Sequence, residues 1–174
     1  IDDDYFILEN TQKFNQLILI RVKKDCMTEY KLTLDIDVSK NIGLNPRFFI
    51  YSEPESSTSI QINWNNSSCS INSVFEFYLS KSAKIDIVIT NNGEDSVAIL
   101  NYAFHLEEKS NMKATFISFG KQILKNDIRV NLKGEKTKSD IGGLYIAKAN
   151  SVIDYNIKMN HLCKKTISKQ FFKG

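Results

Sequence analysis

Short runs of β-branched and aromatic residues recur along this chain at a nearly regular spacing, and this feature constrains the fold most strongly. From residue 74 onward such runs begin about every 10 to 16 residues, with polar stretches between them. Within Lys84–Ile89, the residues Ile85, Ile87 and Ile89 share one face of an extended strand. The spacing therefore predicts an all-β fold built from many short strands.

The composition also favours strands over helices. The chain has only 6 alanines but 17 asparagines, and β-branched residues dominate its apolar runs, a mixture that disfavours helix interiors. The predicted strands are Phe6–Leu8, Leu17–Val22, Tyr30–Val38, Arg47–Tyr51, Ser59–Trp64, Val74–Leu79, Ile85–Thr90, Val97–Phe104, Ala114–Phe119, Asp127–Leu132, Ile141–Ile146, Val152–Met159 and Thr166–Phe172. Loops are predicted at Ser52–Ser59 and Asn63–Ser73, and polar breaks at 91–95, 107–111, 134–138 and 149–151.

Regular short strands without helices between them fit a sandwich, a barrel or a solenoid. The breaks lack the Asn-Gly and Asp-Gly doublets of tight hairpins, apart from Asn92-Gly93. Asn and Ser are dense near the predicted turns, where their side chains can satisfy backbone groups at corners. These two features favour a solenoid, and a sandwich stays open on the pattern alone. We interpret residues 1–174 as one domain.

Charge, hydropathy and cysteine usage exclude several classes of protein. The formal net charge is +3 and the basic residues are scattered, so no nucleic-acid surface is predicted. No window has the ~20 apolar residues of a membrane helix. The three cysteines, Cys26, Cys69 and Cys163, have no short spacing and indicate a reducing compartment. The phosphate-binding glycine motifs are missing, and Gly142-Gly143 is interpreted as a corner or a close backbone approach.

Few residues have a spacing that suggests chemistry. His161 and Cys163 are two positions apart, and in a strand they would share one face and could offer two ligands to iron or zinc. A buried thiol and a half-exposed imidazole without any ligand role is the competing interpretation. The acidic residues Asp86, Asp127, Asp140 and Asp154 show no pairing, but they keep open a β-helix carbohydrate-active enzyme.

A series of short motifs runs in a fixed order through residues 73–174. They are Val74–Leu79 followed by Ala83-Lys84-Ile85, then Phe119-Gly120-Lys121, the run 125–135, Gly143-Leu144-Tyr145, Asp154, His161, Ser168 and Phe172-Lys173-Gly174. In this order and spacing they resemble the SufB/SufD family of iron–sulfur cluster assembly proteins. The departures are Lys125 where the family usually has Arg, Gly120-Lys121 for a Gly-Gly pair, Ser151-Val152 for Gln-His, and a loose match over residues 1–72.

The resemblance implies a right-handed parallel β-helix core, in agreement with the strand spacing. The order Gly-Leu-Tyr, Asp, His, Cys, Ser and Lys-Gly at its ending is more similar to SufD than to SufB, which stays as the alternative. Cys163 departs from that pattern, because it lies only two residues after His161. The resemblance further implies a scaffold without enzymatic turnover or an intrinsic cofactor, acting with SufB and the ATPase SufC. Such a scaffold works in the cytoplasm or a plastid stroma, where the complex transiently assembles an iron–sulfur cluster, with His161 and Cys163 as candidate cluster contacts. Further coils and a helical region that docks on SufC are expected beyond Gly174.

Overall fold

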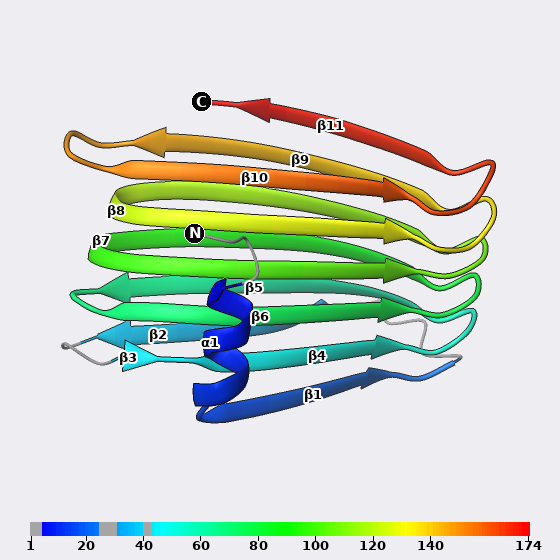
Figure 1. Cartoon of the computed structure of the whole chain (residues 1–174), viewed down its shortest axis with the longest axis horizontal. Coiled ribbons are helices and arrows are strands. Elements are labelled where there is room, and N and C mark those ends of the chain that lie inside the picture. Colours follow the sequence, from blue (N-terminus) through cyan, green and yellow to red (C-terminus); the bar gives the residue numbers. More distant parts are fainter. Residues whose placement is uncertain (1–4, 25–30, 40–42) are drawn as a thin grey trace.

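The computed structural model describes residues 5–24, 31–39 and 43–174 and shows a stack of flat coils (Figure 1). The chain makes about five turns of a parallel β-solenoid. Every strand pairing among the described residues is parallel, which confirms the predicted all-β parallel β-helix and excludes the sandwich. The helix α1 (Tyr5–Lys13) lies across the outside of the stack. Within the described ranges, no helix has the length and hydropathy needed to cross a membrane.

Two parallel sheets face each other across the core. The helix-side sheet, on which α1 packs, contains β1 (Gln16–Val22), β4 (Pro46–Ser52), β6 (Ser70–Leu79), residues 96–106 of β7 (Lys84–Leu106), residues 122–132 of β8 (Asn111–Leu132) and β10 (Val152–His161). The far sheet contains β2 (Leu32–Ser39), β5 (Ser57–Ser67), residues 84–94 of β7, residues 111–121 of β8, β9 (Lys138–Ala147) and β11 (Ile167–Lys173). The short β3 (Gly43–Leu44) pairs with β6. Strands β7 and β8 thus pass through both sheets.

Equivalent positions stack from turn to turn. Lys84 pairs with Asn111, and Asn111 pairs with Lys138, so each of these positions lies one turn of the solenoid beyond the previous one. Inward side chains therefore form columns inside the solenoid. In the column of Phe48, Phe75 and Tyr102, the ring centroids lie 4.1 Å and 5.3 Å apart. Stacked aromatic columns of this kind fill the space between the two sheets.

One corner of each turn repeats a single conformation. The third residue of this corner has a left-handed backbone conformation, with φ from 59° to 64°. In successive turns this residue is Glu55, Ser82, Lys109, Lys136 and Lys165. At four of these corners the next residue donates its hydroxyl to the carbonyl three residues earlier, namely Ser56 to Glu53, Ser110 to Glu107, Thr137 to Gly134 and Thr166 to Cys163. Positive φ is uncommon for residues other than glycine. The repeated hydroxyl–carbonyl bond is a local contact that holds the corner in this shape.

The N-terminal part of the strand prediction is wrong at one place and incomplete at another. Phe6–Leu8 lies in α1 and not in a strand. Tyr30, the first residue of a predicted strand, lies outside the described residues, as does Cys26. The rest of that strand corresponds to β2.

The predicted loop at Asn63–Ser73 is also wrong, because β5 continues to Ser67 and β6 begins at Ser70. Two asparagines of this segment bond to aspartates of β2, since Asn63 Nδ2 donates to Asp35 Oδ1 at 2.7 Å and Asn65 Nδ2 donates to Asp37 Oδ1 at 2.8 Å. The polar break at 91–95 likewise lies within β7, at a register shift between Glu94 and Ser96. Polar composition misled the prediction because polar side chains such as Asn63 and Asn65 lie within a strand and bond to a neighbouring turn.

Candidate functional site

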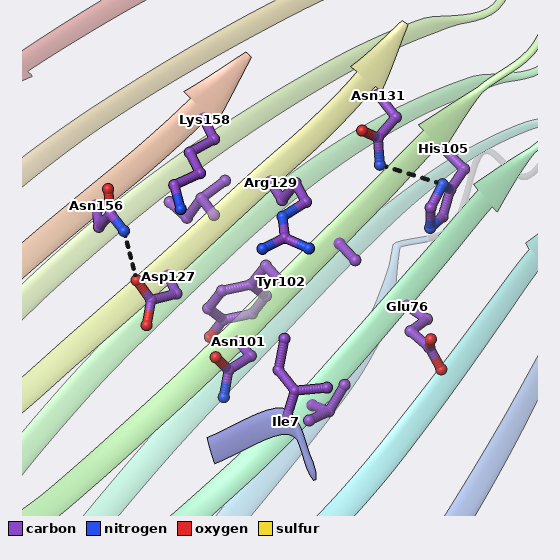
Figure 2. A pocket seen from close by; sticks show the side chains of 13 residues that line it. Ile7, Glu76, Asn101, Tyr102, His105, Asp127, Arg129, Asn131, Asn156 and Lys158 are labelled. Carbon is purple, nitrogen blue, oxygen red and sulfur yellow. Dashed lines mark hydrogen bonds between the residues drawn. The ribbon is translucent and has the colours of Figure 1, made fainter. Parts of the chain in front are cut away.

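A hollow of about 220 Å³ lies on the outer surface of the helix-side sheet, beside α1 (Figure 2). A row of outward residues crosses it, in which Glu76, Ala103, Arg129 and Lys158 are successive partners on β6, β7, β8 and β10. Ala103 has the shortest side chain of the row, so the surface is lower between Glu76 and Arg129. Ile7 of α1 borders the hollow on one side.

Two further rows of outward side chains flank this one. Towards α1, the register aligns Val74, Asn101, Asp127 and Asn156. On the other side it aligns Tyr78, His105, Asn131 and Asn160. Figure 2 places the Arg129 guanidinium in the middle of the labelled side chains, with Asp127 and Lys158 on one side and Glu76 and His105 on the other. The hollow is therefore built from consecutive turns of the solenoid and one helix.

Two buried asparagines attach α1 to the sheet. Asn10 is fully buried, and its Nδ2 donates to the Asn72 carbonyl at 2.8 Å and to the Pro46 carbonyl at 3.3 Å. Asn72 Nδ2 donates in turn to the Phe6 carbonyl at 2.9 Å. These bonds fix the helix beside the hollow and keep Ile7 at its border.

Both carboxylates of the hollow have cationic partners. Arg47 Nε and Nη2 each donate to Glu76 Oε2 at 3.2 Å. Lys125 Nζ lies 3.2 Å from Asp127 Oδ2, and Asn156 Nδ2 donates to Asp127 Oδ1 at 2.9 Å. Arg129 and Lys158 add two positive charges to the lining. The hollow therefore presents groups of both signs.

His105 contributes a neutral polar group to the rim. Partial burial and the nearby Lys133 ammonium lower the pKa of His105. The Asn131 amide nitrogen lies 3.4 Å from His105 Nδ1. A neutral imidazole accepts at one nitrogen and donates at the other, so this contact fits a ring that accepts from Asn131 at Nδ1 and donates from Nε2.

The predicted pair His161 and Cys163 does not share a strand face. Strand β10 ends at His161, whereas Cys163 is the first residue of the following corner, where its carbonyl accepts from Thr166. The His161 ring is held by two hydroxyls, with Nδ1 2.6 Å from Thr166 Oγ1 and Nε2 3.0 Å from Ser168 Oγ. The geometric reason for expecting two convergent ligands was therefore wrong, although the two residues lie in the same corner region.

The described residues do not gather other soft ligands around this corner. Cys69 is a buried free thiol at the corner between β5 and β6, and burial raises its pKa. His105 lies in the hollow. In the described part of the chain, no group of three or more His, Cys, Asp and Glu side chains could hold a metal ion.

The four acidic residues considered for glycoside chemistry lie on two different sheets. Asp86 and Asp140 are exposed on the far sheet, whereas Asp127 and Asp154 belong to the helix-side sheet. Glycoside hydrolysis needs two carboxyl groups on either side of one bond. The four residues therefore do not gather at one site, and each sheet carries two of them.

The hollow was not predicted from the sequence, although one signal was present. Glu76 and Ala103 are register partners, so they lie one full turn of the solenoid apart. The interval from Ala103 to Arg129 is slightly shorter because the register shifts between Glu94 and Ser96. The interval from Arg129 to Lys158 is slightly longer because the turn is longer towards the C-terminal end. A search for polar residues at one-turn spacing would have grouped part of this row.

Comparison with protein families gives one match. Residues 36–174 match the family described as SUF system FeS cluster assembly, SufBD core domain. The matched region contains all strands from β3 to β11 and part of β2. Comparisons with curated proteins and with solved structures find no match.

Proposed function

Because this chain belongs to the SufBD core-domain family of the SUF iron–sulfur cluster assembly system, we propose that it is a SufD-like scaffold subunit. It would act with homologues of SufB and of the ATPase SufC in a reducing compartment, and would carry out no turnover of its own. The iron–sulfur cluster is the cargo of the whole complex. The observation that carries this proposal is the family match, which covers the parallel solenoid from β3 to β11.

The choice of SufD over SufB rests on the motifs of the last two turns. Gly143-Leu144-Tyr145 lies on β9 and is paired with Phe172-Lys173 on β11. His161 and Ser168 both belong to the series of motifs that resembles the family, and His161 Nε2 lies 3.0 Å from Ser168 Oγ across the corner. The SufB paralogue is the alternative within the same complex. If a SufB homologue is found bound to this protein, the SufD-like role is supported. If a SufD homologue is found bound instead, the alternative is supported.

An exposed apolar patch on the far sheet is the surface that we assign to the SufB-like partner. This far-sheet patch consists of Phe119, Leu144, Ile146 and Phe171, which are 40%, 46%, 63% and 72% exposed. Phe119 pairs with Ile146, and Phe171 lies beside Gly142 on the neighbouring strand, so the patch is continuous across β8, β9 and β11. Large apolar side chains gathered on one face are typical of protein interfaces.

Co-purification under reducing conditions tests the scaffold role. The protein is expected to retain homologues of SufB and SufC, and Ile146→Lys or Phe171→Lys should release the SufB homologue while the protein stays folded. Leu8→Lys is the matched control, because Leu8 is 60% exposed on α1, away from the far-sheet patch. Failure of the unmodified protein to retain either homologue would contradict the proposal.

His161 and Cys163 remain proposed contacts of the cluster. Such a contact requires His161 to release Thr166 or Ser168, because both ring nitrogens are engaged. Anaerobic reconstitution of the complex with iron and sulfide tests this role in His161→Ala and Cys163→Ser. Reduced cluster absorbance is expected in both variants but not in Cys69→Ser. Equal absorbance in all of them would remove the two residues from the site.

A further inference from the structure

Charge is unevenly distributed along this chain. Residues 133–174 contain nine lysines and three acidic residues, whereas residues 1–132 contain 14 basic and 17 acidic residues. The formal net charge is therefore +6 over the C-terminal part and −3 over the rest, although the whole chain carries only +3. An asymmetry of this kind indicates that the basic part meets a partner of negative charge.

Some of this positive charge lies on the outer face of the far sheet. The outward residues of β11 are Ile167, Lys169, Phe171 and Lys173, and all four are exposed. Successive outward residues lie two positions apart, so apolar and basic side chains alternate along one line. Within the described residues, neither Lys169 nor Lys173 forms an ion pair with a carboxylate. Both ammonium groups are therefore available to another molecule.

The neighbouring strands extend this face. Leu144 on β9 is the register partner of Lys173, and Asp140 is the register partner of Lys169. Asp140 also pairs with Lys113 on β8, so one aspartate lies between two lysines and the excess charge stays positive. The far-sheet patch thus has an apolar centre with lysines at its border. An apolar core with a polar rim is the usual anatomy of a protein–protein interface.

The spacing of the outward residues on β11 matches an extended chain. Lys169 and Lys173 lie four positions apart, which is about 13 Å along the strand, with Phe171 midway. An extended segment places every second side chain on one face with the same repeat. Three such side chains, at positions i, i+2 and i+4, can therefore meet these three residues at once.

We propose that the outer face of β9 and β11 docks an extended segment of a partner protein in which carboxylates alternate with apolar side chains. Two carboxylates four positions apart lie at Lys169 and Lys173, and the apolar residue between them packs on Phe171 and Leu144. The charged pairs fix the register of the segment, and the apolar contact supplies affinity. This inference rests on the far-sheet patch being a partner surface, as proposed above, and names the chemistry of the segment that covers it.

Two other anionic partners use this face less completely. A nucleic acid would engage the lysines but would place its charged backbone against the apolar side chains of Leu144 and Phe171. An anionic membrane would accept these side chains but would bring lipid phosphates against Asp140. A peptide segment can place a carboxylate at each lysine and an uncharged residue beside Asp140.

Fluorescence anisotropy with a labelled peptide of the repeat Glu-Thr-Leu-Thr tests the proposal, because this repeat places Glu residues four positions apart with Leu midway. In the two matched peptides, Gln replaces every Glu or Ser replaces every Leu. The Glu-Thr-Leu-Thr peptide is expected to bind at least tenfold more tightly than either, and less tightly as salt rises from about 50 to 300 mM. No binding at 1 mM peptide, or equal binding of a matched peptide, would overturn the proposal. Tighter binding of oligothymidylate or of phosphatidylserine vesicles would also overturn it.

Variants then locate the site. Lys169→Glu and Lys173→Glu should each weaken binding of the Glu-Thr-Leu-Thr peptide at least fivefold, and so should Phe171→Ser. Lys84→Glu is the matched control, because Lys84 is an exposed outward residue of β7 in an earlier turn of the far sheet, and it should leave binding unchanged. Unchanged affinity in both folded variants at Lys169 and Lys173 would place the peptide elsewhere and contradict the assignment.

The peptide titration requires no SufB homologue, so it separates this inference from the proposed function. A protein that binds the peptide as expected but retains no SufB homologue supports the inference and contradicts the proposed function. Retention of the SufB homologue without binding of the peptide contradicts the inference alone.

Discussion

The Phe172 ring on β11 occupies the space that a side chain at Gly143 on β9 would need. A Cβ at position 143 would lie 2.2 Å from Phe172 Cε1, and the two residues are register partners. A second contact of the same kind follows, since a Cβ at Gly174 would lie 2.3 Å from Tyr145 Cζ. The motifs Gly143-Leu144-Tyr145 and Phe172-Lys173-Gly174 are thus complementary in shape. The predicted close approach at Gly142-Gly143 involves a ring rather than backbone, and it occurs at Gly143.

Gly143→Ala is expected to destabilise the protein by about 1–3 kcal/mol, because the added methyl group forces the Phe172 ring away from its position. Gly142→Ala is the matched control, since its Cβ would lie 3.6 Å from the Phe171 carbonyl oxygen, an ordinary contact. Urea unfolding measures both. In the Phe172→Ala background the effect of Gly143→Ala should disappear, which a double-mutant cycle detects. Equal losses at positions 142 and 143 would contradict this account.

The repeated corner bond predicts the effect of a single hydroxyl. Ser110 is fully buried and its Oγ donates to the Glu107 carbonyl at 2.6 Å, so Ser110→Ala should cost about 1 kcal/mol of unfolding free energy. Ala83 holds the equivalent place in the preceding turn without a hydroxyl, while its backbone N–H still donates to the Ser80 carbonyl. Ala83→Ser should therefore cost less than Ser110→Ala in urea unfolding. The opposite order would show that the corner hydroxyl is not stabilising.

The sequence predicted the far sheet and most of the helix-side sheet because strand periodicity is local. Ile85, Ile87 and Ile89 alternate within a few residues, and their inward direction follows from that pattern alone. Corners at 107–111 and 134–138 were predictable because the alternation stops there. By contrast, α1 is held by Asn10 against Asn72, which is distant in sequence, and no local pattern signals that contact.

The hollow could not be predicted for a related reason. Its row depends on which residues become neighbours, and the intervals from Glu76 to Ala103, from Ala103 to Arg129 and from Arg129 to Lys158 all differ in length. The register shift between Glu94 and Ser96 changes the alignment within a single turn, which the sequence does not reveal. The prediction for His161 and Cys163 failed for the same reason. The two side chains would share a strand face only if β10 continued to Cys163, and the sequence does not reveal that β10 ends at His161.

His105 should make stability depend on pH. Its pKa is lowered in the folded protein by burial and by Lys133, so the unfolded chain binds the proton more readily. The contribution of neutral His105 to the free energy of unfolding is fully present above about pH 6.5, the ordinary pKa of histidine. This contribution is lost as the pH falls towards the lower pKa that His105 has in the folded state. Urea unfolding at pH 7.5 and pH 5.5 should show a larger loss in the native protein than in His105→Gln. The same loss in both would exclude His105 as the source.

The attachment of α1 can be separated from the stability of the solenoid. Asn10→Ala removes the buried donor to the Asn72 and Pro46 carbonyls, and a loss of about 1.4 kcal/mol or more should raise hydrogen exchange in residues 5–13 at least tenfold. Exchange in β7 and β8 should stay unchanged, because their bonds run between turns. The exposed Gln12→Ala is the control on the same helix. Faster exchange throughout the solenoid in Asn10→Ala would show that α1 contributes to the global fold and is not a separately opening element.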